Sequence, residues 1–167
     1  MRKVKENIIM DKEDIQRTIK RIAYQIYENN INEKKLIIAG IVQNGLTLSN
    51  RIIIELNRIG SLNIELIKIK IDKKNPRNKV SMSKNLDSCK GKSVVIIDDV
   101  LNTGTTLIYA VRHFLSIELK HLQTAVLVNR NHKNFPIKGD FKGISLSTSI
   151  KERIDVRFGD EEGVYLS

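Results

Sequence analysis

Short apolar runs separated by polar stretches indicate a series of β-strands. Leu36 to Ile41, Val94 to Ile97 and Gln123 to Val128 are rich in aliphatic residues, as in strands that are covered on both faces of a sheet. Asn63 to Ile71 alternates apolar with polar residues, which indicates a strand with one face toward the core. Asn7 to Met10 predicts a short edge strand or a lead-in to the first helix.

Between these runs, apolar residues recur at helical spacing. Asp11 predicts the N-cap of a helix from about Lys12 to Asn29, and Asp14 completes a start that resembles a capping box. Further helices are predicted over about Leu46 to Ile59 and over Leu107 to Leu115. Because strands alternate with helices, the pattern predicts an α/β fold with a mainly parallel central sheet, helices on both faces and right-handed crossovers.

Composition narrows the class of protein. The 167 residues suit one α/β domain over 1–167. The formal net charge of +10 favours an anionic partner, either a polyphosphate substrate or nucleic acid, although a solvated basic surface is the alternative. Cys89, the only cysteine, excludes an intrachain disulfide and a cysteine-based metal site. Since no long apolar run or signal-like start is present, we expect a cytoplasmic protein with no membrane partner, and Met1 to Lys5 as a short basic arm.

The residues after the strand Val94 to Ile97 carry the candidate chemistry. Asp98 and Asp99 follow where this strand should end, and open α/β sheets bind ligands at the carboxyl ends of their strands. A small, hydroxyl-rich turn then enters the next helix and can present N–H groups and hydroxyls to a phosphate. The turn consists of Asn102, Thr103, Gly104, Thr105 and Thr106. The order fits a ligand with a sugar diol and a phosphate; a buried strand with a polar turn and no ligand is the alternative.

This stretch resembles the phosphoribosyl-pyrophosphate (PRPP) signature of the type I phosphoribosyltransferases, which has four hydrophobic residues, two acids and a Thr/Gly loop. The resemblance implies the type I phosphoribosyltransferase fold with a small C-terminal hood. It also implies that Asp98 and Asp99 are catalytic, hold the ribose and meet Mg²⁺ indirectly, through the substrate. The turn 102–106 would bind the phosphate of PRPP. The loop after the first long strand would bind pyrophosphate through Gln43, Asn44 and Gly45, although an ordinary strand-to-helix turn is the alternative.

The segment from Asp72 to Lys90 is polar, basic and nearly free of apolar residues, which predicts a long flexible loop or hairpin. In the family resembled, a mobile loop at this place closes over PRPP and excludes water. Its candidate residues for neutralising the leaving pyrophosphate are Asp72, Lys73, Lys74 and Arg77. A disordered basic loop without that function is the alternative.

Two further segments resemble one family of phosphoribosyltransferases, PyrR, whose members regulate pyrimidine genes and transfer phosphoribose to uracil. These are Ile9 to Ala23 and Asn129 to Gly143, and Thr148-Ser149 with a following strand, Ile154 to Phe158, also fits. The resemblance implies a hood at about 129–150. It implies a base-binding set consisting of Val128, Asn129, Arg130, Phe135, Ile137 and Phe141.

Two functions follow from the resemblance. The first is a Mg²⁺-dependent transferase that converts PRPP and a nucleobase, most simply uracil, to UMP and pyrophosphate. The second is a regulator that senses nucleotide and binds RNA, rather than DNA. For either function the resemblance implies a homodimer or higher homo-oligomer. The candidate RNA-binding residues of the regulator are Arg17, Lys20, Arg21, Arg130, His132, Lys133 and Lys138; a solvated basic face is the alternative for the helix residues among them.

The sequence also departs from the PyrR pattern. Gln43-Asn44 stand where the family has Thr-Arg, so a bidentate cation for diphosphate is missing and activity is expected to be weak. Asn129 replaces an Asp at the base site, which adds a hydrogen-bond donor. Asn131 and Lys133 replace Gly and Arg in a region tied to RNA binding. The enzyme is therefore the first hypothesis, since the substrate signature is intact.

Overall fold

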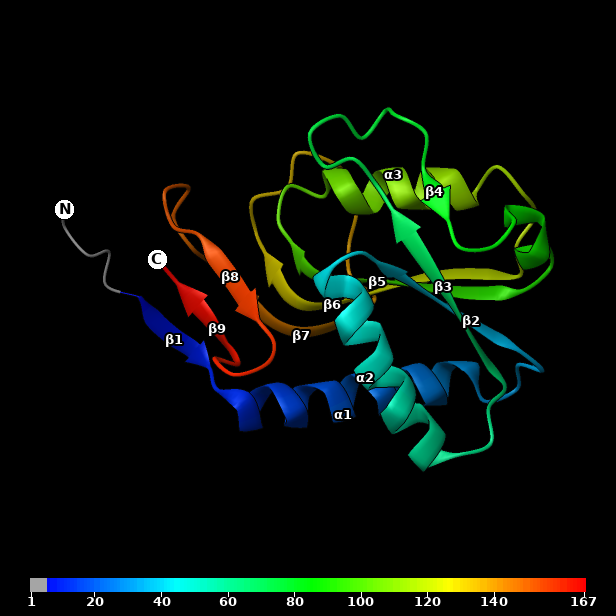
Figure 1. Cartoon of the computed structure of the whole chain (residues 1–167), viewed down its shortest axis with the longest axis horizontal. Helices are drawn as coiled ribbons and strands as arrows, with labels where there is room; N and C mark the ends of the chain where they lie inside the picture. The colour runs from blue at the N-terminus through cyan, green and yellow to red at the C-terminus, as the bar shows by residue number, and fades with distance from the viewer. Residues whose placement is uncertain (1–5) are drawn as a thin grey trace.

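The computed structural model describes residues 6–167 and contains two β-sheets and three α-helices within that range (Figure 1). The predicted arm, Met1 to Lys5, lies outside the described residues. In chain order the elements are β1 (Asn7–Met10), α1 (Lys12–Asn30), β2 (Leu36–Ile41), α2 (Asn44–Ile59), β3 (Ile64–Lys70), β4 (Ser81–Met82), the 3₁₀ turn η1 (Leu86–Cys89), β5 (Ser93–Leu101), α3 (Thr105–Phe114), β6 (His121–Arg130), β7 (Phe141–Leu146), β8 (Ile154–Arg157) and β9 (Gly163–Leu166).

The main sheet has six strands in the order β4-β3-β2-β5-β6-β7. All neighbours are parallel except β4, which pairs antiparallel with β3 at one edge. The predicted α/β fold with a mainly parallel sheet is therefore confirmed. Strands β2, β5 and β6 occupy the centre, which explains why their sequences are apolar on both faces.

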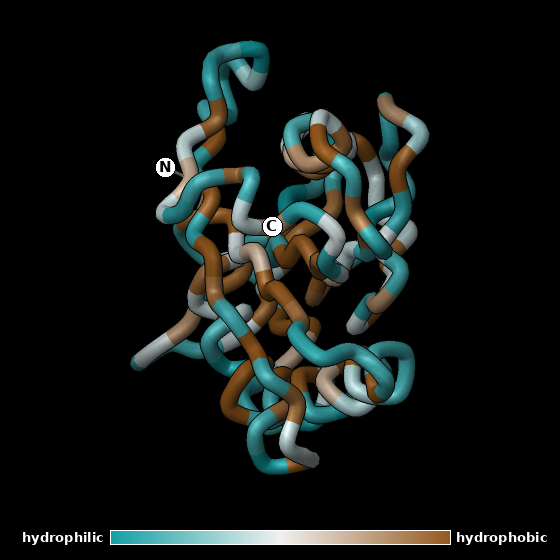
Figure 2. The backbone as a smooth tube through the Cα atoms, turned by 90° about the vertical axis from the view of Figure 1, so that its right-hand side faces the viewer, coloured by the Kyte–Doolittle hydropathy of each residue, from teal (hydrophilic) through white to brown (hydrophobic). Residues whose placement is uncertain are grey.

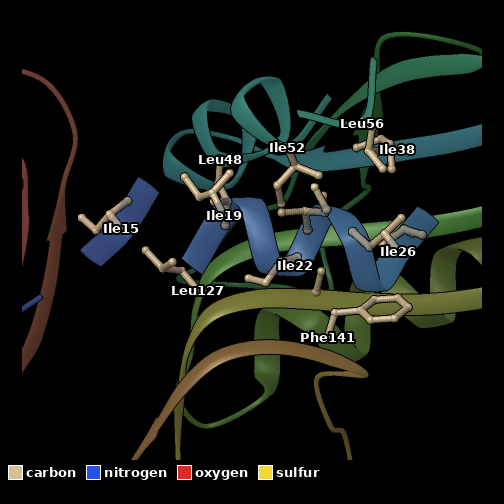
Figure 3. Close-up of a cluster of buried hydrophobic side chains, with 14 of the residues drawn as sticks. Ile15, Ile19, Ile22, Ile26, Ile38, Leu48, Ile52, Leu56, Leu127 and Phe141 are labelled. Carbon is tan, nitrogen blue, oxygen red and sulfur yellow. The ribbon is translucent and has the colours of Figure 1, made fainter. Parts of the chain in front are cut away.

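Helices cover both faces of this sheet. α1 and α2 pack on one face, and α3 packs on the other (Figure 1). Alternate residues of β2 serve the two sides: Ile38 lies in the core beneath α1 and α2, whereas Ile37 and Ala39 lie in the core beneath α3. Figure 3 shows the first of these cores, in which the isoleucines of α1 pack against α2, β6 and β7. The predicted capping box of α1 is also present, because Asp11 and Asp14 exchange two hydrogen bonds between side chain and backbone.

The order of the strands creates a crevice at the carboxyl ends of the neighbouring central strands β2 and β5. β2 leads through α2 to β3 on one side, whereas β5 leads through α3 to β6 on the other side. Adjacent strands whose connections leave in opposite directions define the switch point at which open α/β sheets bind ligands. The N-termini of α2 and α3 both follow strands at this point.

The second sheet joins the two ends of the described chain. β1 pairs with β9, and β9 pairs with β8, in both cases antiparallel (Figure 1). The expected hood segment, 129–150, is organised differently from the prediction: it contains β7, which pairs in parallel with β6 and extends the main sheet. The hood of this protein is the small sheet of β1, β9 and β8, which lies beside the main sheet.

The long segment 72–90 is partly ordered. β4 pairs with the end of β3, and η1 places Cys89 in the core under α3. The carboxylate of Asp72 accepts hydrogen bonds from the backbone N–H groups of Lys74 and Asn75 and from the side chain of Asn78. Asp72 thus closes the turn at 72–78, whereas Val80, Met82, Leu86 and Cys89 attach the rest of the segment to the core under α3.

Hydrophobic segments run through the middle of the molecule and hydrophilic segments form the outer loops (Figure 2). Among residues 6–167, no helix combines the length and the apolar character needed to cross a lipid bilayer.

Two isoleucines on α2 test the packing of this helix. Ile52 is fully buried against α1 and β2, whereas Ile54 is 51% exposed. We expect Ile52→Ala to lower the free energy of unfolding by about 2–5 kcal/mol through reduced burial and a cavity, and Ile54→Ala to lower it by less than about 1 kcal/mol. Urea denaturation of both variants measures the difference, and equal losses would contradict the packing described for α2.

Candidate active site

The two acids lie where β5 loses one of its neighbours. β5 does not end at Ile97 as predicted but continues to Leu101, because its pairing with β6 extends to Leu101 opposite Asn129. Pairing with β2 on the other side ends at Ile97. Asp98 and Asp99 therefore sit at the opening of the crevice, with one side of the strand still held in the sheet.

Burial makes Asp98 an unusual carboxylate. It is 5% exposed, and burial together with the neighbouring charge of Asp99 raises its pKa to about 8; the charge of Lys73 opposes this shift. A carboxylate that is desolvated beside a second acid in a crevice is typical of a functional site, because such an arrangement works against folding. Asp98 also accepts a hydrogen bond from the N–H of Asp99.

Gly45 lets the loop after β2 approach these acids. A Cβ on Gly45 would lie 2.7 Å from the carbonyl oxygen of Ile97 and 3.0 Å from the Cα of Asp98, so a larger residue would force the loop away. Its neighbour Asn44 donates through Nδ2 to Asp99 Oδ2 and to the carbonyl of Val156, both at 2.9 Å. Asn44 therefore ties the acid pair to strand β8 of the hood, and both hydrogens of its amide are used within the protein.

The hydroxyl-rich turn is closed by a glycine in a left-handed conformation. Gly104 has φ +86° and precedes α3, where the first N–H groups of the helix lack intrahelical acceptors. The hydroxyls of Thr103 and Thr105 lie 2.9 Å apart, and the carbonyl of Thr103 accepts from the N–H of Asn134 at 2.8 Å. The N–H of Thr105 donates to the Thr103 hydroxyl at 3.4 Å, and the turn thus combines helix N-terminal N–H groups with two threonine hydroxyls, which suits a phosphate.

A cavity of about 380 Å³ joins the acids and this turn. From the predicted set, its lining includes Asp98, Asp99, Asn102, Thr103, Thr106, Arg130 and, from the flexible loop, Lys73. A smaller hollow beside it completes the turn with Gly104 and Thr105. The structure therefore places the acid pair, Asp98 and Asp99, and the turn 102–106, here called the phosphate turn, around one cavity.

The cavity also has residues that sequence reasoning did not identify. Arg153, Ile154, Asp155 and Val156 line it from the start and body of β8. The strand itself was predicted at Ile154 to Phe158, but its position beside the acids depends on the pairing of β8 with β9 and on the hydrogen bond from Asn44 to Val156. Arg153 is notable because it adds an arginine to the lining of a cavity whose neighbouring loop lacks one.

A second hollow, of about 490 Å³, adjoins the phosphate turn. It is lined by Asn102, Thr103, Arg130, Asn131, His132, Lys133, Asn134 and Ile150. Arg130 forms the boundary between the two spaces and is buried; its guanidinium donates to Asn102 Oδ1, to the Thr148 hydroxyl and to two backbone carbonyls of the 149–152 turn. Arg130 therefore holds the walls of both hollows together.

The remaining predicted base-binding residues divide into three groups. The side chains of Val128 and Phe141 are buried in the core beneath α1 and line neither hollow, so a contact of either residue with a base stays a prediction (Figure 3 shows Phe141). Phe135 and Ile137 lie over the phosphate turn, where a Cβ on Gly104 would meet Ile137 at 2.5 Å. Asn129 is buried and donates to the hydroxyl of Ser145 at 3.1 Å, and its Oδ1 has no hydrogen-bond partner within residues 6–167.

The other predicted contacts are only partly assembled. Gln43, Asn44 and Gly45 line none of the described cavities. Of the flexible-loop residues, only Lys73 lines the acid-pair cavity. Asp72 closes its own loop, as described above, and Lys74 lies with Lys73 along an open basic hollow. Arg77 lies next to α3.

The candidate RNA residues do not form one patch. Arg17, Lys20 and Arg21 lie on α1, on one face of the main sheet, whereas residues 132–138 extend toward α3 on the other face. Arg17 is paired with Asp14, and Arg21 donates to the carbonyls of Lys142 and Gly143. His132 hydrogen-bonds the carbonyl of Thr148, and Lys138 lies 3.4 Å from Asp140.

The donor set of the cavity fits Mg²⁺, which prefers oxygen ligands and needs only one or two protein carboxylates beside a phosphorylated substrate. Asp98 and Asp99 supply such oxygens at the opening of the cavity. Within residues 6–167, no group of three or more His, Cys, Asp or Glu side chains is placed to hold a metal ion.

Comparison with known proteins agrees with this geometry. A family model described as the phosphoribosyl transferase domain matches residues 7–160. The chain therefore belongs to the phosphoribosyltransferase family. The bifunctional protein PyrR of Brevibacillus brevis is 33% identical in an alignment 165 positions long, which covers 94% of this chain and 92% of the relative. The bifunctional protein PyrR of Chloroflexus aurantiacus is 34% identical in an alignment 167 positions long, which covers 95% of this chain and 92% of the relative. The resemblance to PyrR is thus confirmed.

Solved structures show the same fold. The hypoxanthine phosphoribosyltransferase of Trypanosoma cruzi superposes with a TM-score of 0.80 at 16% identity, over 96% of this chain and 95% of that one. A hypoxanthine-guanine phosphoribosyltransferase from Bacillus anthracis gives a TM-score of 0.73 at 18% identity, over 87% and 84%. At these identities the likeness concerns the fold.

Replacing Asp98 tests whether the raised pKa of this carboxyl lowers the stability of the folded protein. In the unfolded chain Asp98 loses its proton near pH 4, and in the folded protein near pH 8. Between these values the folded state holds the extra proton, so the free energy of unfolding falls as pH rises. We expect Asp98→Asn, which has no proton to lose, to be more stable than the parent at about pH 9, on the order of a few kcal/mol.

The measurement is urea denaturation of the ligand-free proteins at about pH 5 and about pH 9, with Asp160→Asn at an exposed position as control. The advantage of Asp98→Asn is expected to shrink toward pH 5. A difference that is the same at both values would show that the raised pKa is not its cause.

Proposed function

We propose that this protein is a Mg²⁺-dependent phosphoribosyltransferase that transfers the phosphoribosyl group of PRPP to uracil, giving UMP and pyrophosphate. The observation that carries the proposal is one cavity that contains two adjacent carboxylates and a threonine-rich turn at the start of α3. Membership of the phosphoribosyltransferase family and the similarity to proteins named PyrR support it.

Each part of the cavity has a role in that reaction. The turn 102–106 holds the 5′-phosphate through N–H groups and hydroxyls. Asp98 and Asp99 accept hydrogen bonds from the ribose hydroxyls and stabilise the positive charge that develops on the sugar as pyrophosphate leaves. Mg²⁺ carried by the substrate supplies charge neutralisation of the diphosphate, with these two carboxylates beside it.

The role of Asn44 differs from that expected from the sequence. Its amide is committed to Asp99 and Val156, so Asn44 is a positioning residue that keeps the Asp99 carboxylate oriented toward the cavity. Other cations then bind the diphosphate of PRPP. Lys73 and Arg153 line the cavity, and Arg153 offers the planar guanidinium that the loop after β2 lacks.

The base is assigned to the hollow beyond Arg130. This hollow adjoins the phosphate turn through Asn102 and Thr103 and presents polar groups of the 131–134 segment together with the exposed side chain of Ile150. Polar groups read the edge of a base, and an aliphatic side chain covers its face. Lys74 and Arg77 are assigned to the diphosphate after closure of the loop 72–90.

Release of pyrophosphate from PRPP and Mg²⁺ tests the transferase. We expect turnover with uracil and much slower turnover with hypoxanthine, guanine, adenine and orotate. The double substitution Asp98→Asn, Asp99→Asn is expected to lower kcat by at least about 10³-fold while the far-ultraviolet circular dichroism stays unchanged, because it removes both charges that face the sugar. Asp160→Asn is the matched control with expected parental activity. If phosphoribose is transferred to none of the five bases, the proposed transferase activity is refuted.

A regulator of pyrimidine genes that binds RNA is the second candidate, favoured by the relatives named bifunctional protein PyrR and by the net charge of +10. In this function the cavity serves as a nucleotide sensor. The α1 residues Lys20 and Arg21 and the loop residues Lys133 and Lys138 lie on different faces, so the RNA would have to span both or meet a second copy of the chain.

For this candidate we expect UMP-dependent binding to one RNA sequence, with an affinity that falls steeply with salt. Lys20→Gln plus Lys133→Gln should weaken binding and lower the slope of log affinity against log salt by about 1 for each phosphate that is no longer neutralised. Gel-shift titrations at several salt concentrations measure both. Equal affinity for unrelated RNAs would reduce the effect to net charge.

A further inference from the structure

A separate hollow lies between the loop 72–90 and the outer surface of α3. It measures about 260 Å³ and is lined by Pro76, Arg77, Asn78, Lys79, Val80, Tyr109, Arg112, His113 and Ser116. None of the residues that line the acid-pair cavity belongs to it. It is therefore a distinct feature, at the middle and end of α3 rather than at the phosphate turn.

The charge in this hollow is of one sign. Arg77 and Lys79 enter from the loop and Arg112 from α3, while no acidic residue is among those that line it. Within the described part of the chain, these three cations form no ion pair with a carboxylate, although many other cations of this protein do. A cation near the end of a helix is favourable by itself, which accounts for Arg112 but not for Arg77 and Lys79.

Both walls of the hollow are held in place. On the loop side, Asp72 closes the turn through Lys74, Asn75 and Asn78, and β4 is paired with β3. Met82 at the end of β4 contacts the ring of His113 on α3, with Sδ and Nε2 3.1 Å apart. The three cations are thus gathered by ordered elements. They are exposed, so water and salt screen part of their mutual repulsion, and a bound anion would neutralise the rest.

We propose that this hollow is a second anion site, which binds a short phosphate chain such as a diphosphate or triphosphate. Two guanidinium groups can each form paired hydrogen bonds with phosphate oxygens, and Lys79 adds a third charge. The hydroxyl of Tyr109 supplies a further donor, whereas the Ser116 hydroxyl already donates to the carbonyl of His113 and one N–H of the Asn78 amide donates to Asp72. The volume is just below that of usual small-molecule sites, about 300–1,000 Å³, which favours a phosphate chain over a whole nucleotide.

The site has a consequence for the reaction that rests on the proposed transferase. Arg77 is needed at the diphosphate of PRPP when the loop closes, and an anion in the second site holds Arg77 against α3 instead. Occupancy therefore keeps the loop open and slows turnover. The binding itself does not depend on the transferase.

Tripolyphosphate is the probe, and amide resonances of the ¹⁵N-labelled full chain are the readout, since they separate the two sites. We expect the resonances of 76–80 and 109–116 to shift together and to saturate, with a midpoint different from that of any response at 102–106. Arg112→Gln is expected to weaken binding at the second site at least tenfold and to leave the response at 102–106 unchanged. Ser116→Asp, which adds a negative charge, is expected to abolish binding of tripolyphosphate at the second site.

Lys34→Gln is the control, because it removes one exposed positive charge elsewhere on the surface. An equal loss of binding in Lys34→Gln, or the absence of saturable shifts around the hollow, would overturn the site. Turnover assays then address the consequence alone: tripolyphosphate should inhibit the parent protein more strongly than Arg112→Gln. If the protein binds tripolyphosphate at the hollow but transfers no phosphoribose, the second anion site is supported and the proposed transferase activity is refuted.

Discussion

The burial of two adjacent carboxylates at the end of β5 is the constraint around which the crevice is built. Asp98 loses most of its hydration and lies beside Asp99, so its charged form is unfavourable in the ligand-free protein. The surrounding structure offsets part of this cost. The N-termini of α2 and α3, the amide of Asn44 and the charge of Lys73 all bring positive potential or hydrogen-bond donors toward the acids. The remaining cost of burying the charged carboxylates would be offset by a ligand that brings hydroxyls and a cation.

The topology explains why these groups meet. α2 and α3 leave the sheet in opposite directions from neighbouring strands, so their N-termini face the same opening. Gly45 allows the first loop to lie against Asp98, and Gly104 allows the second to turn sharply under Ile137. The small sheet then closes the crevice from the side, because Asn44 is bonded to Val156 of β8. A change in the pairing of β8 with β9 would therefore reach the acid pair through Asn44 and through the β8 residues that line the cavity.

The basic residues of this protein serve more than one purpose. Arg130 is buried and holds together the walls of two hollows, Arg17 is paired on its own helix, and Arg21 braces α1 against β7. The sequence suggested a common RNA-binding role for them, yet their contacts are mostly internal. Several cations that form no ion pair within residues 6–167 lie beside the loop 72–90, among them Arg77, Lys79 and Arg112 around the hollow next to α3. Net charge alone thus overstates the surface that is available to nucleic acid.

The sequence by itself determined the α/β class, the positions of the main strands and helices, the acid pair and the phosphate turn. These features depend on local periodicity and on residues that are contiguous between Val94 and Thr106, so no distant contact is needed to recognise them. Only the tertiary structure decided that Val128 and Phe141 are core residues, that Asn44 is bonded to Asp99, and that β8 brings Arg153 to the cavity. The direction of a side chain on a strand depends on register, and the neighbours of β8 depend on pairing between the two ends of the chain. Both are long-range properties that the order of residues does not display.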